Sequence, residues 1–176
     1  EVAVAGAVCT QPYAPFRITP EEVEMVEVGS HDTHSRRRIF HILGQNAAGR
    51  AGNLLVSELY GDPGCWSGYP PHKHDEFSDE EVELEEIYYV ETRSTDPRGA
   101  DPVGYLRVYG SSADRPLDVL AEVRTGDVVL VPHGWHGPAV AAPDADLYYL
   151  NVMAGPRRNW RFVAAPEVQW IMDRDA

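Results

Sequence analysis

The sequence predicts an all-β protein, a sandwich or barrel of short antiparallel strands with short irregular or helical segments at its ends. Two observations carry the prediction. Short apolar or alternating runs recur at intervals of about 8 to 12 residues, and turns rich in Gly, Pro, Asp or Ser separate them, as at residues 61–64 and 96–99. Few segments suggest helices, so the spacing is typical of an antiparallel sandwich or barrel.

The N-terminal part is the least regular. Residues 1–8 alternate weakly between apolar and small residues, which predicts a strand, and a Pro-rich connection follows over residues 11–16. Thr19-Pro20-Glu21-Glu22 combines a capping residue, a proline in the first turn and a glutamate three residues after the cap. A short helical turn is therefore expected there, ended by Gly29-Ser30.

From residue 36 onward the chain is predicted to consist of strands joined by turns. The predicted strands cover residues 36–43, 53–60, 67–74, 84–92, 104–109, 117–123, 128–132, 139–141 and 147–153. Ala154-Gly155-Pro156 ends the last strand. Four apolar residues are then expected to anchor an irregular tail on the barrel: Trp160, Phe162, Trp170 and Ile171.

Length and charge limit the classes of function that the sequence allows. The 176 residues fit one soluble domain with a sizeable core. No apolar run approaches the roughly 18 residues of a membrane span, and no complete signal peptide is visible, so a cytoplasmic location is expected. The net charge of −13 argues against binding to nucleic-acid phosphates. It would also repel a small anion, so an acid that binds here needs a local positive centre.

Two segments rich in histidine are candidates for a metal site. If residues 67–74 form a strand, His72 and His74 point to the same face, because strand side chains alternate. Taken alone, such a pair is more often two surface histidines than two ligands. In the second segment a Gly-Asp turn at residue 126 starts an apolar strand, Pro132 and Gly134 end it, and His136 follows.

These segments resemble the two motifs of the cupin superfamily, whose fold is a jelly-roll barrel, also called a double-stranded β-helix. In that fold three histidines and one carboxylate converge on a divalent metal. The resemblance implies that His72, His74, Glu86 and His136 are the ligands. Strand alternation does not decide between Glu85 and Glu86, and the resemblance selects Glu86. Such a ligand set suits zinc or manganese best, with iron or nickel as further candidates.

Longer segments resemble a narrower family. Residues 66–75, 84–89, 107–109 and 147–156 together are similar to the 5-deoxy-glucuronate isomerase family of inositol catabolism. Members of that family have two cupin halves, and this chain resembles the second. The resemblance implies that residues 1–35 are a remnant strand and connection from a missing first cupin. Residues 36–176 would then form the metal-binding cupin domain with its C-terminal tail.

The resemblance also implies a function, a metal-dependent aldose–ketose isomerase that converts 5-deoxy-glucuronate to 5-dehydro-2-deoxy-gluconate in myo-inositol breakdown. This reaction needs an acid–base group and an electrophile such as a divalent metal. Tyr88 shares a strand face with Glu86 and is the candidate for proton transfer. Arg107 is the candidate to bind the substrate carboxylate. Tyr149 and Asn151 share one face of the last strand and are candidate substrate-binding residues.

Two other functions stay open. The same ligands bind iron in cupin dioxygenases, and a non-catalytic sugar-binding cupin would keep the ligands without the catalytic geometry. Tyr88 could likewise be a packed core tyrosine, and Arg107 part of a surface ion pair. The expected partners are a small sugar acid and, by resemblance, a second copy of the chain in a homodimer. Neither nucleic acid nor a membrane is expected as a partner.

Overall fold

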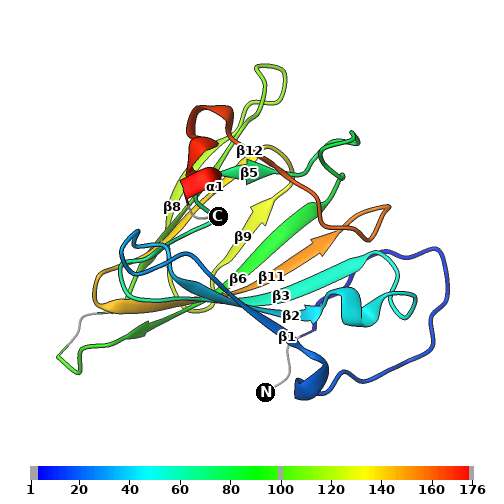
Figure 1. The fold of residues 1–176 in the computed structure, drawn as a ribbon, viewed down its shortest axis with the longest axis horizontal. Coiled ribbons are helices and arrows are strands. Elements are labelled where there is room, and N and C mark those ends of the chain that lie inside the picture. The colour runs from blue at the N-terminus through cyan, green and yellow to red at the C-terminus, as the bar shows by residue number, and fades with distance from the viewer. Residues whose placement is uncertain (1–3, 99–100, 175–176) are drawn as a thin grey trace.

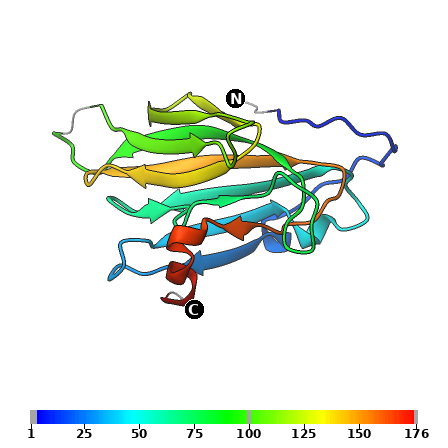
Figure 2. The same cartoon turned by 90° about the horizontal axis from the view of Figure 1, so that it is seen from above.

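Two antiparallel sheets face each other in the structure, a computed structural model that describes residues 4–98 and 101–174 (Figure 1, Figure 2). The first sheet runs in the order β1 (Glu24–Val28), β2 (Arg37–Leu43), β3 (Leu54–Gly61), β11 (Ala145–Ala154), β6 (Glu85–Ser94) and β9 (Val128–Val131). The second runs β12 (Val163–Ala164), β5 (His72–Lys73), β10 (Trp135–Ala141), β7 (Gly104–Tyr109) and β8 (Asp118–Val123), with β4 (Trp66–Ser67) paired to β10.

The helical elements are short and lie outside the sheets. They are η1 (Pro20–Glu22), η2 (Gln45–Ala47), η3 (Pro166–Val168) and α1 (Trp170–Arg174). The predicted turn at Thr19 is confirmed as η1, with a complete capping box between Thr19 and Glu22. Within the described ranges, no helix is both long enough and apolar enough to cross a membrane.

The predicted strands from residue 36 onward are found, and two of them differ from the predicted extent by more than two residues. The segment 67–74 is split into β4 and β5, because Gly68 has a positive φ of 59° and two prolines follow it, which interrupts strand pairing. Strand β10 begins at Trp135, earlier than predicted, and pairs with β7 through a bulge between His136 and Ala139.

Two predictions for the N-terminal part are wrong. Residues 4–8 form no strand, and residues 1–3 lie outside the described residues. The sequence reasoning also missed β1, which pairs with β2 along its whole length. Its residues alternate, with Val26 and Val28 turned toward the interior, and β-branched valines favour a strand once a neighbour is available.

The core lies between the two sheets. Strand β6 shows why: Glu86, Tyr88 and Val90 are buried while Glu85 and Ile87 on the opposite face are exposed. The buried cluster combines β6, β3 and β11 of the first sheet with β7 and β10 of the second.

One row of paired residues crosses the inner face of the first sheet. Tyr88 pairs with Asn151, Asn151 with Ser57, and Ser57 with His41. Side chains directly opposite each other on neighbouring antiparallel strands lie about 5 Å apart. The register therefore lines up four polar side chains across four strands, facing into the barrel.

Candidate metal centre

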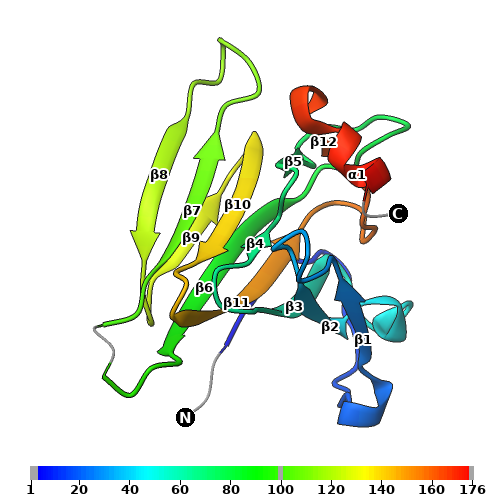
Figure 3. The ribbon, with the colours of Figure 1, turned by 60° about the vertical axis from the view of Figure 1, so that its left-hand side comes forward.

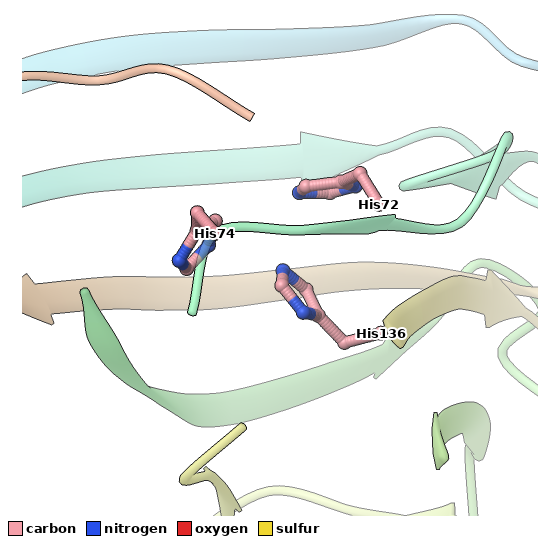
Figure 4. A group of neighbouring side chains, drawn as sticks. All are labelled: His72, His74 and His136. Carbon is pink, nitrogen blue, oxygen red and sulfur yellow. The ribbon is translucent and has the colours of Figure 1, made fainter. Parts of the chain in front are cut away.

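Three histidines meet inside the barrel. Ligand atoms of His72, His74 and His136 all lie within 4.8 Å of one another, and Figure 4 shows their rings turned toward a common point. His72 and His136 are paired residues of β5 and β10, and His74 follows directly after β5. The predicted shared face of His72 and His74 is thus retained, although the strand that carries His72 is only two residues long.

Glu86 completes the cluster from the opposite sheet. Its Oε2 lies 3.0 Å from Nε2 of His74 and 3.0 Å from Nε2 of His136, and its side chain is fully buried. The structure therefore brings together all four residues that the sequence singled out as ligands. Glu85, the alternative, points outward on the exposed face of β6.

The backbone orients each imidazole. Nδ1 of His74 lies 3.1 Å from the Leu84 carbonyl oxygen, Nδ1 of His136 lies 3.4 Å from that of Gly134, and the His72 ring bonds to the Pro70 carbonyl. A carbonyl oxygen only accepts hydrogen bonds, so in each contact the ring nitrogen must carry the proton. In the neutral form of each ring the second nitrogen is then a lone-pair donor, the arrangement typical of histidine ligands. The contact of His74 Nε2 with Glu86 is a hydrogen bond only when that ring carries both protons.

The electrostatics of the cluster suit a cation. Burial and repulsion from His136 and His74 hold the pKa of His72 well below its usual value. Burial also opposes a charge on Glu86, but His136 and His74 outweigh it and lower the pKa of Glu86 far below its usual range. Burial works likewise against a charge on His74, and its hydrogen bond to Glu86 reverses the effect and raises its pKa. A carboxylate that stays ionised among buried imidazoles is a ready metal ligand.

Two buried polar atoms in the cluster have no hydrogen-bond partner. They are Nε2 of His136, whose contact with Glu86 lacks hydrogen-bond geometry, and Oδ1 of Asn151. Unsatisfied buried polar atoms are uncommon and mark strain, function or an ion that belongs at the site. Three imidazole nitrogens and one carboxylate form a donor set that zinc, manganese, iron and nickel all accept. The residues present therefore fit a divalent metal.

A cavity of about 610 Å³ opens beside the cluster. Tyr88, Tyr149 and Asn151, three of the predicted functional residues, line it together with His72. Asn151 donates a hydrogen bond from Nδ2 to Oε1 of Glu86, so its amide orients the predicted ligand. Tyr149 is hydrogen-bonded to Ser67, and its hydroxyl lies 2.5 Å from the Ser67 Oγ.

The structure corrects the prediction for Arg107. On β7 the neighbouring residues Leu106 and Val108 are buried, whereas Arg107 lies on the outer face. Its guanidinium is 46% exposed, stacks on Tyr109 and lies 3.5 Å from Asp118. Alternation along a strand shows which residues share a face, but it does not reveal which face is the inner one.

Sequence reasoning missed Arg37 and His41, which both line the cavity. Nδ1 of His41 lies 3.2 Å from the Ser57 Oγ. The signal was available in the strand period, since Arg37, Ile39 and His41 occupy one face of β2. What the sequence did not show was that this face looks into the barrel.

The C-terminal tail forms one side of the cavity. It contributes three of the predicted anchors to the cavity wall, Trp160, Phe162 and Ile171, together with Met172. Figure 3 shows the tail beside β5. Trp170 is an exception to the prediction, because it is 60% exposed at the start of α1. The ring of Phe162 lies 5.0 Å from that of His72, so the tail contacts the histidine cluster directly.

A buried ion cluster lies on the other side of the ligand segment. Nζ of Lys73 is 2.5 Å from Glu81 and 3.1 Å from Asp75. Asp75 also accepts hydrogen bonds from the Gly134 backbone N–H and from Arg115. Lys73 thus faces away from the histidines, as alternation predicts, and ties the segment that carries His72 and His74 to the turn that precedes His136.

Replacing Lys73 with methionine is expected to lower the free energy of unfolding by about 3 kcal/mol, because it leaves the buried Glu81 without its cation and Asp75 with Arg115 alone. Urea denaturation measures the loss. Arg93→Met is the matched control, since Arg93 is 83% exposed where it pairs with Asp146, and such pairs contribute about 0–1 kcal/mol. Equal losses in the two variants would contradict the structural role of the Lys73 cluster.

Fold and site together define a cupin, a jelly-roll barrel with a histidine and carboxylate cluster inside it. The structure of a cupin-2 domain from Rhodospirillum rubrum matches with a TM-score of 0.54 over 94% of this chain and 90% of that one, at 15% identity, which supports the fold alone.

The chain belongs to the KduI/IolB family, whose model matches residues 1–171. It is 41% identical to a 5-deoxy-glucuronate isomerase of Geobacillus thermodenitrificans over 174 residues, covering 95% of this chain and 58% of that protein. The crystal structure of an IolB-like protein from Salmonella typhimurium matches at 37% identity with a TM-score of 0.78, covering 92% of this chain and 57% of that one. The chain thus spans less than two thirds of these relatives.

Proposed function

We propose that this chain carries the catalytic centre of a metal-dependent sugar-acid isomerase, which converts 5-deoxy-glucuronate to 5-dehydro-2-deoxy-gluconate in myo-inositol catabolism. The observation that carries the proposal is the convergence of His72, His74, His136 and Glu86 beside a cavity of about 610 Å³. A cavity of that size suits a small molecule. The relatives named 5-deoxy-glucuronate isomerase support the substrate and the reaction.

His72, His74, His136 and Glu86 would hold one divalent ion, with zinc and manganese the first candidates. When bound, the ion supplies an electrophile that stabilises negative charge developing on the sugar oxygens. Asn151 keeps Glu86 in place through its amide. The apolar side chains of the tail, Trp160 and Phe162 among them, limit the access of water to the cavity.

Tyr88 acts as the acid in this proposal. Burial and the neighbouring charge of Glu86 raise the pKa of Tyr88 well above its usual value. Its phenol is therefore protonated near neutral pH and donates a hydrogen bond or proton to a sugar oxygen. Tyr149, whose pKa is raised to about 12, mainly by burial, stays protonated as well and bonds to Ser67. Its ring packs beside that of Tyr88 at 5.0 Å and fixes the position of Tyr88.

The partners in this proposal are the sugar acid and a second copy of the chain in a homodimer, and the location is the cytoplasm. The cavity supports the first of these.

Chelation is expected to abolish turnover of 5-deoxy-glucuronate by the metal-loaded protein, and zinc or manganese is expected to restore it, because the electrophile is lost and regained. The measurement is formation of the ketose, with metal content determined in the same samples. Absence of turnover by fully loaded protein would overturn the proposal. Oxygen consumption by the iron-loaded protein would indicate a dioxygenase instead, and sugar binding without turnover would indicate a non-catalytic cupin.

A further inference from the structure

The cavity contains one arginine that the proposed metal centre does not use. Arg37 points from β2 into the cavity, on the same face as Ile39 and His41. Among the cavity-lining residues in the described part of the chain, Arg37 is the sole Lys or Arg, and none is Asp or Glu. In a chain with a net charge of −13, this places a local positive charge where an anion would otherwise be repelled.

Arg37 also differs from its neighbours in having no acidic partner. Arg36 lies 2.9 Å from Glu27 and 2.6 Å from Asp62, and Arg38 lies 3.8 Å from Asp62. Over residues 4–98 and 101–172, whose side chains the structure describes, Arg37 has no carboxylate within ion-pair distance, and its hydrogen bond from Nη1 goes to the Ser35 carbonyl. A guanidinium has five N–H donors, so most of its fork is available to a ligand.

The strand register places Arg37 away from the metal ligands, at the far side of the two tyrosines. Successive rows on the inner face contain Glu86, then Tyr88 with Asn151, then Tyr149, then Arg37 with Gly61 and Leu147. The ring of Tyr88 lies 6.3 Å from that of His136, and the positive charge of Arg37 reaches Tyr149 strongly enough to oppose the rise in the pKa of Tyr149. The cavity therefore has histidines at one end and a guanidinium toward the other.

We propose that Arg37 binds the carboxylate of the substrate through its guanidinium fork and makes the cavity selective for sugar acids over uncharged sugars. The identity of the acid rests on the proposed function. A linear sugar acid has its carbonyl and its carboxylate at opposite ends, and the cavity is likewise lined by His72 of the histidine cluster and, in a different row, by the long side chain of Arg37. Arginine is suited to this role because two parallel N–H donors meet both carboxylate oxygens.

The test compares Arg37→Gln and Arg37→Lys with Arg107→Gln in the metal-loaded chain. Arg107 is the matched control because its guanidinium lies on the outer face of β7. The substrates are 5-deoxy-glucuronate and the uncharged 5-deoxy-hexose with the same aldehyde end. Arg37→Gln is expected to lower kcat/KM for the acid by roughly 10- to 100-fold, mainly through KM. Little change is expected for the uncharged sugar.

Arg37→Lys should retain part of the acid preference, since it keeps the charge and loses the fork, and Arg107→Gln should behave as the unmodified chain. An equal loss for both sugars in Arg37→Gln would show a merely structural role and overturn the proposal, as would no loss for either.

Calorimetric binding of D-glucuronate and D-glucose separates this proposal from the proposed function. If the unmodified chain turns over no 5-deoxy-glucuronate but binds the acid more tightly than the neutral sugar, and Arg37→Gln removes that preference, the role of Arg37 holds while the isomerase assignment fails. Lack of any acid preference in the unmodified chain would overturn the proposal for Arg37.

Discussion

Replacing His136 with alanine is expected to remove the bound metal and to lower isomerase activity by roughly 10³-fold or more, the effect of losing an electrophile that contributes several kcal/mol. His136 lies at the centre of the cluster. Its ring is 4.3 Å from that of His72 and 4.8 Å from that of His74, and its Nε2 faces Glu86 at 3.0 Å. Its substitution therefore removes a ligand and leaves Glu86 with less compensation for its buried charge.

Metal content by mass spectrometry and turnover of 5-deoxy-glucuronate measure the effect, with circular dichroism as the check on folding. His31→Ala is the control, because the side chain of His31 is 70% exposed and lies outside the cavity. Full metal content in a folded His136→Ala variant would exclude His136 as a ligand and would require another fourth group at the site.

Replacing Tyr88 with phenylalanine is expected to lower kcat by about 10²-fold or more, while KM and metal content change little. The substitution removes one hydroxyl from a side chain that is 5% exposed and leaves the ring in contact with Tyr149. The packing of the core is thus largely preserved. The loss should fall on the step in which a proton or hydrogen bond reaches the sugar oxygen, since Tyr88 is the buried phenol beside Glu86.

Tyr105→Phe is the matched control for Tyr88→Phe. Tyr105 is 43% exposed on the outer face of β7, where its hydroxyl donates to Glu122. Steady-state kinetics on both variants separate kcat from KM. An unchanged kcat in Tyr88→Phe would show that Tyr88 is a packed core tyrosine without a role in proton transfer. A rise in KM with an unchanged kcat would show that it binds substrate instead.

Local patterns in the sequence were sufficient for most of the fold. Strand alternation and turn residues set the extents of β6, β7 and β11 to within about two residues. The same alternation placed Glu86 and Tyr88 on one face. The predicted extents failed where glycine and prolines interrupt a strand, between β4 and β5, and where a capping signal precedes a strand, as at β1.

The inner face of a strand was harder to predict than its alternation. Arg37 shares a strand face with Ile39, and Arg107 lies between Leu106 and Val108, and sequence reasoning chose Arg107 as the binding residue. Which face is buried depends on pairing between strands that are far apart in the chain, such as β3 with β11. Such non-local information is absent from the spacing of residues in any one strand. The cavity wall formed by the tail, with Met172 in it, depends on non-local packing in the same way.

The pairing of β12 with β5 connects the C-terminal tail to the strand that carries His72, one of the candidate metal ligands. Val163 pairs with Lys73 and Ala164 with His72, and the Ala165 N–H donates to the Pro71 carbonyl. A tail that swings away to admit a ligand must break these bonds and release one edge of the strand that holds His72. In a metal-loaded chain, whatever stabilises the docked tail would therefore raise the affinity for the ion, and a bound ion would favour the docked tail to the same degree.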